Sequence, residues 1–116
     1  MEINLISEKR TVVAKIDTDL DHHSAVQIRR AVDSKIKSSN AVNVIFDFSQ
    51  VDFMDSSGIG MLMGRYKITN ILGGKVIIYG MKKQIKRIVD MSGIDKIITV
   101  CESLDNALDF IERKER

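Results

Sequence analysis

A stretch of small polar residues lies between an acidic side chain and the start of an apolar run. It is Asp55-Ser56-Ser57-Gly58-Ile59-Gly60. Carboxylate and hydroxyl oxygens at such a position accept hydrogen bonds from the free N–H groups of a helix start, so the simplest role is a helix cap. The glycines indicate more than a cap, because each costs about 1 kcal/mol relative to alanine in a helix. A helix start without side chains lets another group approach the backbone and favours an anion there.

Three kinds of chemistry can be compared with this stretch. Dinucleotide binding uses glycines after a strand, but here the third glycine, Gly64, comes one residue late, and the next strand ends without an acid for a ribose. A serine nucleophile needs a base, and the sequence offers only His22 and His23 and has no GxSxG turn. A phosphate acceptor is the third, because the dipole of a helix stabilises a phosphate on a hydroxyl at its N-terminus.

A second polar stretch, Asp21-His22-His23, has the residue types of a metal site. A small metal- or serine-dependent phosphohydrolase would use these side chains with Asp55, and Asp47 is a further candidate ligand. Adjacent residues at a helix start point in different directions, however, and the sequence has no second histidine cluster. We therefore expect surface and capping roles, no metal and no cofactor, and keep the phosphohydrolase as the alternative function.

The whole chain limits the class of protein. Its 116 residues make one domain, and an apolar share of 44% supports one packed core and argues against disorder. The 18 basic and 16 acidic residues are too balanced for a nucleic-acid-binding surface. The sequence has no apolar run long enough to span a membrane, no signal core at the N-terminus, and a single cysteine, Cys101. We expect a cytoplasmic protein that binds neither nucleic acid nor membrane.

Strands and helices are expected to alternate after an opening hairpin of residues 2–7 and 11–16. The first helix has apolar residues at helical spacing, which are Ala25, Ile28, Val32 and Ile36. Further strands are expected at 41–48, 75–80 and 96–101, and further helices at 57–72, at 81–91 and from Ser103 onwards. This alternation is typical of an α/β domain with a largely parallel sheet, and the hairpin makes the sheet mixed.

The helix expected after the serines carries two apolar stripes. The spacing of the first predicts a core-facing set, which consists of Ile59, Leu62, Met63 and Tyr66. The second lies on the side of Ser57 and consists of Met61, Gly64 and Ile68. It is either a second buried face or a docking surface, for which methionine beside glycine is suited.

Four segments of the chain occur in a fixed order. They are Leu20-Asp21-His22-His23, Phe53-Met54-Asp55-Ser56-Ser57-Gly58, Gly64-Arg65-Tyr66-Lys67 and Asp90-Met91-Ser92-Gly93. Together, at these separations, they resemble the STAS domain of bacterial anti-sigma factor antagonists, and specifically the sporulation stage II antagonists, over nearly the whole chain. One departure is Thr18, which stands where many relatives have glycine, and Asp21 is kept.

This resemblance implies a protein switch and not an enzyme, on a single STAS domain of residues 1–116 with a small mixed sheet and about four or five helices. Unphosphorylated, such a protein binds an anti-sigma factor serine kinase and so releases a sporulation sigma factor. Ser56 is implied as the phosphoacceptor, and a sporulation serine phosphatase reverses the modification. The residues expected to contact the partner are Asp21, His22, His23, Asp55, Ser57, Gly58, Met61 and Gly64. We expect a monomer when the protein is free.

Electrostatic repulsion explains how the switch would work. A phosphate adds a charge of about −1.5 to −2. At an effective dielectric constant of about 20, two like unit charges about 4 Å apart repel by about 4 kcal/mol. A partner that presents a carboxylate or a nucleotide phosphate near Ser56 would therefore be released without refolding of the domain.

Overall fold

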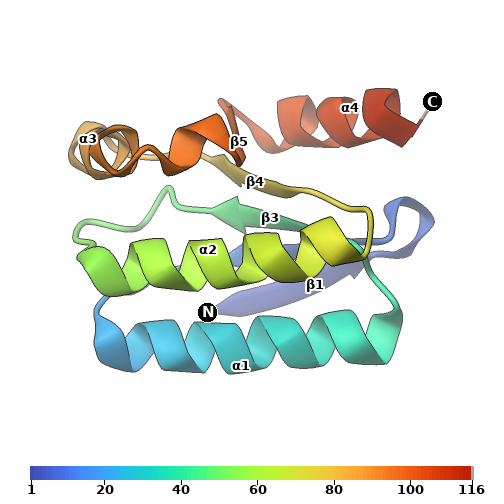
Figure 1. Ribbon diagram of the computed structural model, residues 1–116, viewed down its shortest axis with the longest axis horizontal. Coiled ribbons are helices and arrows are strands. Elements are labelled where there is room, and N and C mark those ends of the chain that lie inside the picture. The colour runs from blue at the N-terminus through green and yellow to red at the C-terminus, as the bar shows by residue number, and fades with distance from the viewer. Residues whose placement is uncertain (116) are drawn as a thin grey trace.

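Across residues 1–115, which the computed structural model describes, one sheet has five strands in the order β1-β2-β3-β4-β5 (Figure 1). The strands are β1 (Glu2–Ile6), β2 (Thr11–Lys15), β3 (Asn43–Asp47), β4 (Val76–Tyr79) and β5 (Thr99–Cys101). β1 pairs antiparallel with β2, and the other neighbours pair in parallel. The prediction of a mixed sheet with an opening hairpin is confirmed.

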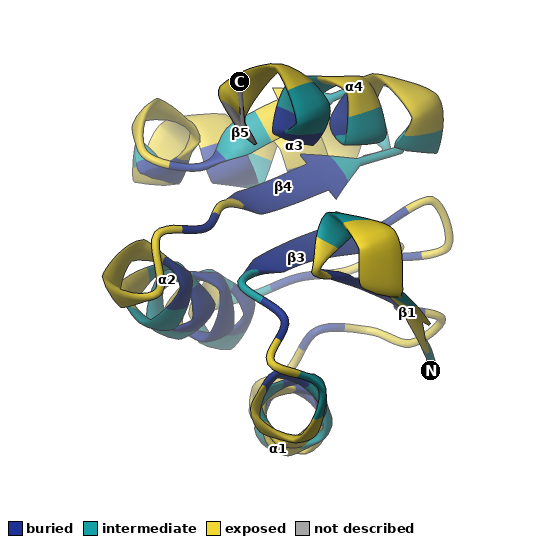
Figure 2. Cartoon of the chain, turned by 90° about the vertical axis from the view of Figure 1, so that its right-hand side faces the viewer, coloured by how far each residue is buried: buried dark blue, intermediate teal, exposed yellow. Residues whose placement is uncertain are grey.

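The same residues form four α-helices and two short 3-10 helices. They are α1 (His22–Ser39), α2 (Ser56–Ile71), α3 (Lys83–Ser92), α4 (Leu104–Glu115), η1 (Ser7–Lys9) and η2 (Ile94–Lys96). α1 and α2 lie on one side of the sheet and α4 on the other (Figure 2). Within residues 1–115, no helix combines the length and the apolar character that a membrane span requires.

The central strand β3 separates two apolar cores. All five of its residues are buried, as the β-branched and aromatic residues of this segment predicted. Successive side chains of a strand point to opposite faces. Val44 and Phe46 therefore pack in the larger core with α1, α2 and α3, whereas Ile45 packs in the smaller core with Ala107 and Ile111 of α4.

Several element ends differ from the sequence prediction, and three of these differences have a clear local cause. α1 begins at His22 and α2 at Ser56, because an aspartate immediately before each helix caps it. β5 begins only at Thr99, because the Ile97 and Ile98 N–H groups donate to the carbonyl of Ile94, at 3.0 Å in each case. These local hydrogen bonds keep the preceding residues out of the sheet.

Candidate functional site

The loops that precede α1 and α2 are hydrogen-bonded to each other. The Leu20 N–H donates to the Phe53 carbonyl at 2.9 Å, and the Asp55 N–H donates to the Leu20 carbonyl at 3.1 Å. Leu20 and Met54 thereby form a parallel bridge, and both are buried. The pairing places the starts of α1 and α2 side by side (Figure 1).

Asp55 caps α2 and leaves Ser56 free. The Asp55 Oδ1 atom accepts a hydrogen bond from the Ser57 N–H at 2.8 Å, which confirms the predicted cap. Ser56 is the first residue of the helix and is exposed, and within residues 1–115 its hydroxyl has no hydrogen-bond partner. Ser57 lies inside the first turn rather than capping it. A phosphate on an exposed hydroxyl at a helix N-terminus would be stabilised by the helix dipole.

Asp21 caps α1 in the equivalent way. Its Oδ1 atom accepts from the Ser24 N–H at 2.9 Å, and its own N–H donates to the Ser24 hydroxyl oxygen at 3.1 Å, which is a reciprocal capping box. The hydrogen bond from the Ser24 backbone lowers the pKa of the exposed Asp21 carboxyl. Asp21 is therefore a fixed negative charge beside Ser56, and the loop keeps this cap with Thr18 in place of glycine.

The side chains of the two histidines lie in different surroundings, as expected for neighbouring residues on a helix. His22 faces α2 across a groove, whereas the His23 Nε2 atom lies 3.2 Å from the Gln27 Nε2 atom one turn along α1. Among residues 1–115, no three or more His, Cys, Asp or Glu side chains are grouped so that they could hold a metal ion.

The three glycines of α2 have two different roles. A Cβ atom on Gly58 would lie 2.4 Å from the Met54 Cγ atom and 3.2 Å from the Leu20 Cβ atom. A Cβ atom on Gly60 or Gly64 would meet no heavy atom within 4 Å. The expectation that all three open the helix to a partner is therefore wrong for Gly58, which is buried where α2 packs on the paired loops.

A groove of about 280 Å³ runs between α1 and α2 beside Ser57. Its walls are one face of each helix, formed by His22, Ala25, Val26 and Arg29 of α1 and by Ser57, Gly60, Met61, Gly64 and Arg65 of α2. Met61 is only 5% exposed and belongs to the larger core. The predicted docking role of its side chain is corrected accordingly, because Met61 packs inward at the base of the groove.

The predicted core stripe of α2 is confirmed. Leu62 is fully buried, and Ile59, Met63 and Tyr66 are partly buried against the same core. Met61 of the second stripe is buried as well, so near the groove the exposed positions of α2 are Ser56 and Gly60.

Arg65 and Asp33 join α1 to α2 below the groove, and the sequence motifs gave them no role. The Arg65 Nε atom lies 2.8 Å from the Asp33 Oδ1 atom, without the N–H direction of a hydrogen bond. Burial lowers the pKa of the Arg65 guanidinium, and burial raises the pKa of the Asp33 carboxyl. The sequence feature that could have indicated a role for Arg65 is its position eight residues after Ser57, on the same helix face.

Phe53 is a second residue that the sequence did not single out for partner contact. Its side chain is 50% exposed although its carbonyl is held by Leu20. Asp52, which precedes it, contacts Lys82 at the start of α3. The loop is thus fixed at several points while an aromatic ring faces outward three residues before Ser56.

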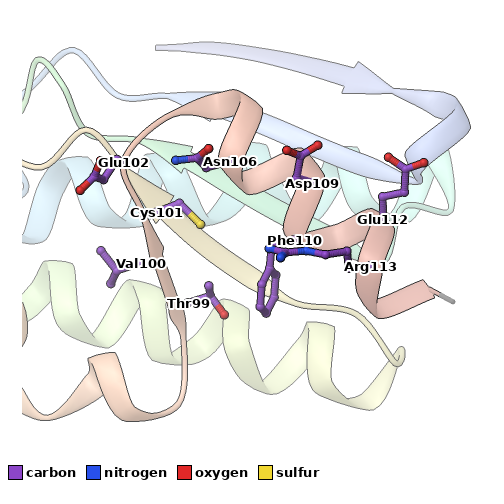
Figure 3. A pocket seen from close by; sticks show the side chains of 9 residues that line it. All are labelled: Thr99, Val100, Cys101, Glu102, Asn106, Asp109, Phe110, Glu112 and Arg113. Atoms are coloured by element: carbon purple, nitrogen blue, oxygen red, sulfur yellow. The ribbon is translucent and has the colours of Figure 1, made fainter.

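A larger hollow, of about 680 Å³, lies between β5 and α4 on the other face of the sheet (Figure 3). Cys101 and Phe110 contribute to it together with the carboxylates of Glu102 and Asp109. Burial raises the pKa of the Cys101 thiol, which is opposite to what an activated nucleophile needs. This hollow is separated from Ser56 by the sheet and is not part of the site.

Comparisons with known proteins agree with this geometry. The STAS domain family matches residues 2–107. The chain is 30% identical over 112 residues to an anti-sigma F factor antagonist of Paenibacillus polymyxa, which covers 97% of this chain and 96% of the relative.

Two solved structures are similar over nearly their whole length. The anti-sigma factor antagonist SpoIIAA in its unphosphorylated form is 25% identical with a TM-score of 0.83, covering 97% of this chain and 96% of that one. The Bacillus cell fate determinant SpoIIAA in the phosphorylated form is 25% identical with a TM-score of 0.73, covering 95% and 97%. Such antagonists are regulatory binding proteins and not enzymes. This chain belongs to the STAS domain family and, within it, to the anti-sigma factor antagonists.

Proposed function

We propose that this protein binds an anti-sigma factor serine kinase through the paired starts of α1 and α2, and that phosphorylation of Ser56 ends the binding. The observation that carries the proposal is the free, exposed Ser56 hydroxyl at a helix N-terminus that Asp55 already caps. Adding a phosphate there breaks no hydrogen bond of the folded protein.

The paired helix starts have the composition of a contact surface. Asp21 supplies an exposed carboxylate, Asp55 a half-buried one, and Phe53 a half-exposed ring. Because backbone hydrogen bonds hold the loops, little conformational entropy is lost when a partner docks. A partner surface with a cationic side chain beside an apolar pocket complements this arrangement.

Charge at Ser56 supplies the switch. The phosphate would stand next to the Asp55 carboxylate at the helix start, where the helix dipole compensates part of the added charge. The domain therefore stays folded, whereas a partner carboxylate or nucleotide phosphate at the same place is repelled. The Bacillus relative that was solved in its phosphorylated form supports a modified state with this fold.

The remaining steps of the proposed cycle follow from this switch. The unphosphorylated protein occupies the kinase and so releases a sporulation sigma factor. A serine phosphatase of the same pathway removes the phosphate and restores binding. Ser56 is accessible enough for both enzymes, because it is exposed and outside the groove.

The test is the intact mass of the protein after incubation with the anti-sigma factor kinase of the same genome and ATP, followed by peptide mapping. We expect one added phosphate on Ser56, none in Ser56→Ala, and an unchanged result in Ser57→Ala. Phosphate uptake by Ser56→Ala would move the acceptor to another residue. Absence of phosphate on the wild-type protein, with the kinase active on a known substrate, would remove the switch.

A further inference from the structure

The groove between α1 and α2 is lined by two positively charged side chains. Arg29 of α1 and Arg65 of α2 both line it. Both guanidinium groups act electrostatically on the Asp33 carboxylate, and Arg29 also acts on Arg65. Two cations thus lie near one carboxylate, with Arg65 buried and Arg29 exposed.

Arg65 has unused hydrogen-bonding capacity in this groove. It is 4% exposed, yet within residues 1–115 its single hydrogen bond runs from Nη1 to the Met61 carbonyl at a long 3.4 Å. Its Nε atom has no hydrogen-bond partner, although Asp33 lies 2.8 Å away. A buried guanidinium with so few hydrogen bonds is uncommon, and an oxygen ligand in the groove can accept from its Nη donors.

The groove also has room above the arginines. Gly60 and Gly64 form its wall on α2, and a Cβ atom on either would meet no heavy atom within 4 Å. Arg29 is exposed, so its guanidinium can turn toward an incoming group. The space is accessible from the surface on which Ser56 lies, because Ser57 forms its rim.

We infer that this groove receives one carboxylate side chain, from a glutamate or aspartate of the anti-sigma factor kinase, and that Arg29 and Arg65 bind it. The inference rests on the proposed function and adds a second contact to it. Guanidinium groups are suited to carboxylates because their planar donors match two oxygens at once. A confined charge pair of this kind also contributes more than one at the exposed rim of an interface.

The contact would fix the register of the partner. Asp21 and Asp55 put negative charge at the N-terminal end of the groove, where both carboxylates accept hydrogen bonds from their own helices. Arg29 lies seven residues beyond His22, which is roughly 10 Å along a helix. The partner is therefore expected to present a cation at the helix starts and an acid about two turns farther along.

The test compares the affinity of four proteins for the purified kinase by calorimetry: the wild type, Arg29→Gln, Arg30→Gln and Gly64→Leu. Arg30 is the matched control, since it carries the same charge on α1 and is exposed outside the groove. We expect Arg29→Gln and Gly64→Leu to bind at least about tenfold more weakly, and Arg30→Gln to bind within about twofold of the wild type. Unfolding curves of all four should show folded proteins, because Arg29 is exposed and Gly64 has open space.

Reversing the charges on both proteins identifies which acidic residue of the kinase supplies the carboxylate. Arg29→Glu should abolish binding, and replacing one acidic residue of the kinase by lysine should restore it. Equal losses for Arg29→Gln and Arg30→Gln would overturn the inference, since that is a general effect of net charge. The inference would also be overturned if Arg29→Gln bound the kinase as tightly as the wild type. If inorganic phosphate then shifted the NMR signals of the Gly60 and Gly64 amides, the groove would be a site for free anions only. A wild-type protein that does not bind the kinase would instead refute the proposed function itself.

Discussion

Asp55 donates its backbone N–H to the carbonyl of Leu20, the residue before Asp21, at 3.1 Å. Two aspartates that are 34 positions apart in the chain thereby cap two helices that start side by side. Neither cap depends on the other's side chain, because the link between the loops is made by backbone atoms.

Replacing Asp55 separates capping from charge. Asp55→Ala removes the acceptor of the Ser57 N–H and should lower the free energy of unfolding by about 1 kcal/mol. Asp55→Asn keeps an acceptor oxygen and should be nearly as stable as the wild type. Denaturant unfolding of the three proteins measures this, and equal loss in both variants would show that the carboxylate charge matters more than the hydrogen bond.

The glycines of α2 should respond in opposite directions to alanine. Gly58→Ala places a Cβ atom against Met54 and Leu20, and the strain should outweigh the gain in helix propensity, for a net loss of about 1–2 kcal/mol. Gly64→Ala meets open space and should gain up to about 1 kcal/mol. Thermal unfolding distinguishes the two, and a stabilised Gly58→Ala would mean that Met54 moves aside freely.

The ion pair between Arg65 and Asp33 should be costly to break from one side. Asp33→Ala leaves a buried guanidinium without its counter-charge and should destabilise the protein by about 2–3 kcal/mol, less than for a fully buried pair because Asp33 is 35% exposed. The double variant Asp33→Leu with Arg65→Met should recover most of this loss. A double-mutant cycle by denaturant unfolding measures the interaction free energy between the two side chains. If the losses in stability simply add, the two side chains do not interact energetically.

Phe53 should matter for binding and little for stability. Phe53→Ala removes a half-exposed ring, and we expect the affinity for the anti-sigma factor kinase to fall by about tenfold or more. Ile71→Ala is the control, because Ile71 is 84% exposed at the far end of α2. If both variants bind equally well, the aromatic side chain is not an anchor.

Acid should weaken the cap of α1. The pKa of Asp21 is lower in the folded protein than its usual 3.8. The unfolded chain therefore binds the proton more readily, so the contribution of Asp21 is present above pH 3.8 and is lost as the pH falls through the lower folded value. Unfolding midpoints of the wild type and Asp21→Asn, measured down to acidic pH, should converge. A constant difference would exclude the titration of Asp21 as the cause.

Much of the fold follows from patterns that operate within short segments. β3 was predicted because its segment is rich in β-branched and aromatic residues, and α1 because Ile28, Val32 and Ile36 repeat at helical spacing. The sequence predicted a cap at Asp55-Ser56-Ser57 but placed the start of α2 one residue late, because it did not show which of the three residues accepts the hydrogen bond.

The candidate site was predictable where the motif itself carries the chemistry, as at Ser56. It was not predictable where distant segments meet. Gly58 is needed because Met54 and Leu20 pack against it, and Arg65 finds Asp33 on another helix, 32 positions away. Spacing within one segment contains no information about such contacts, so it left open whether the stripe of Met61 is buried or a docking surface, and Met61 is buried.

The backbone pairing of Leu20 with Phe53 and Asp55 has a consequence for the partner specificity of related signalling proteins. Amide and carbonyl groups are the same in every residue, so the two loops can change their outward side chains without losing their alignment. Duplicated copies of such a protein could therefore acquire different partners by surface substitutions alone, on an unaltered scaffold. Surface positions such as Phe53 and Arg29 would then determine which partner each copy binds, in natural or engineered pathways, while the serine switch is retained.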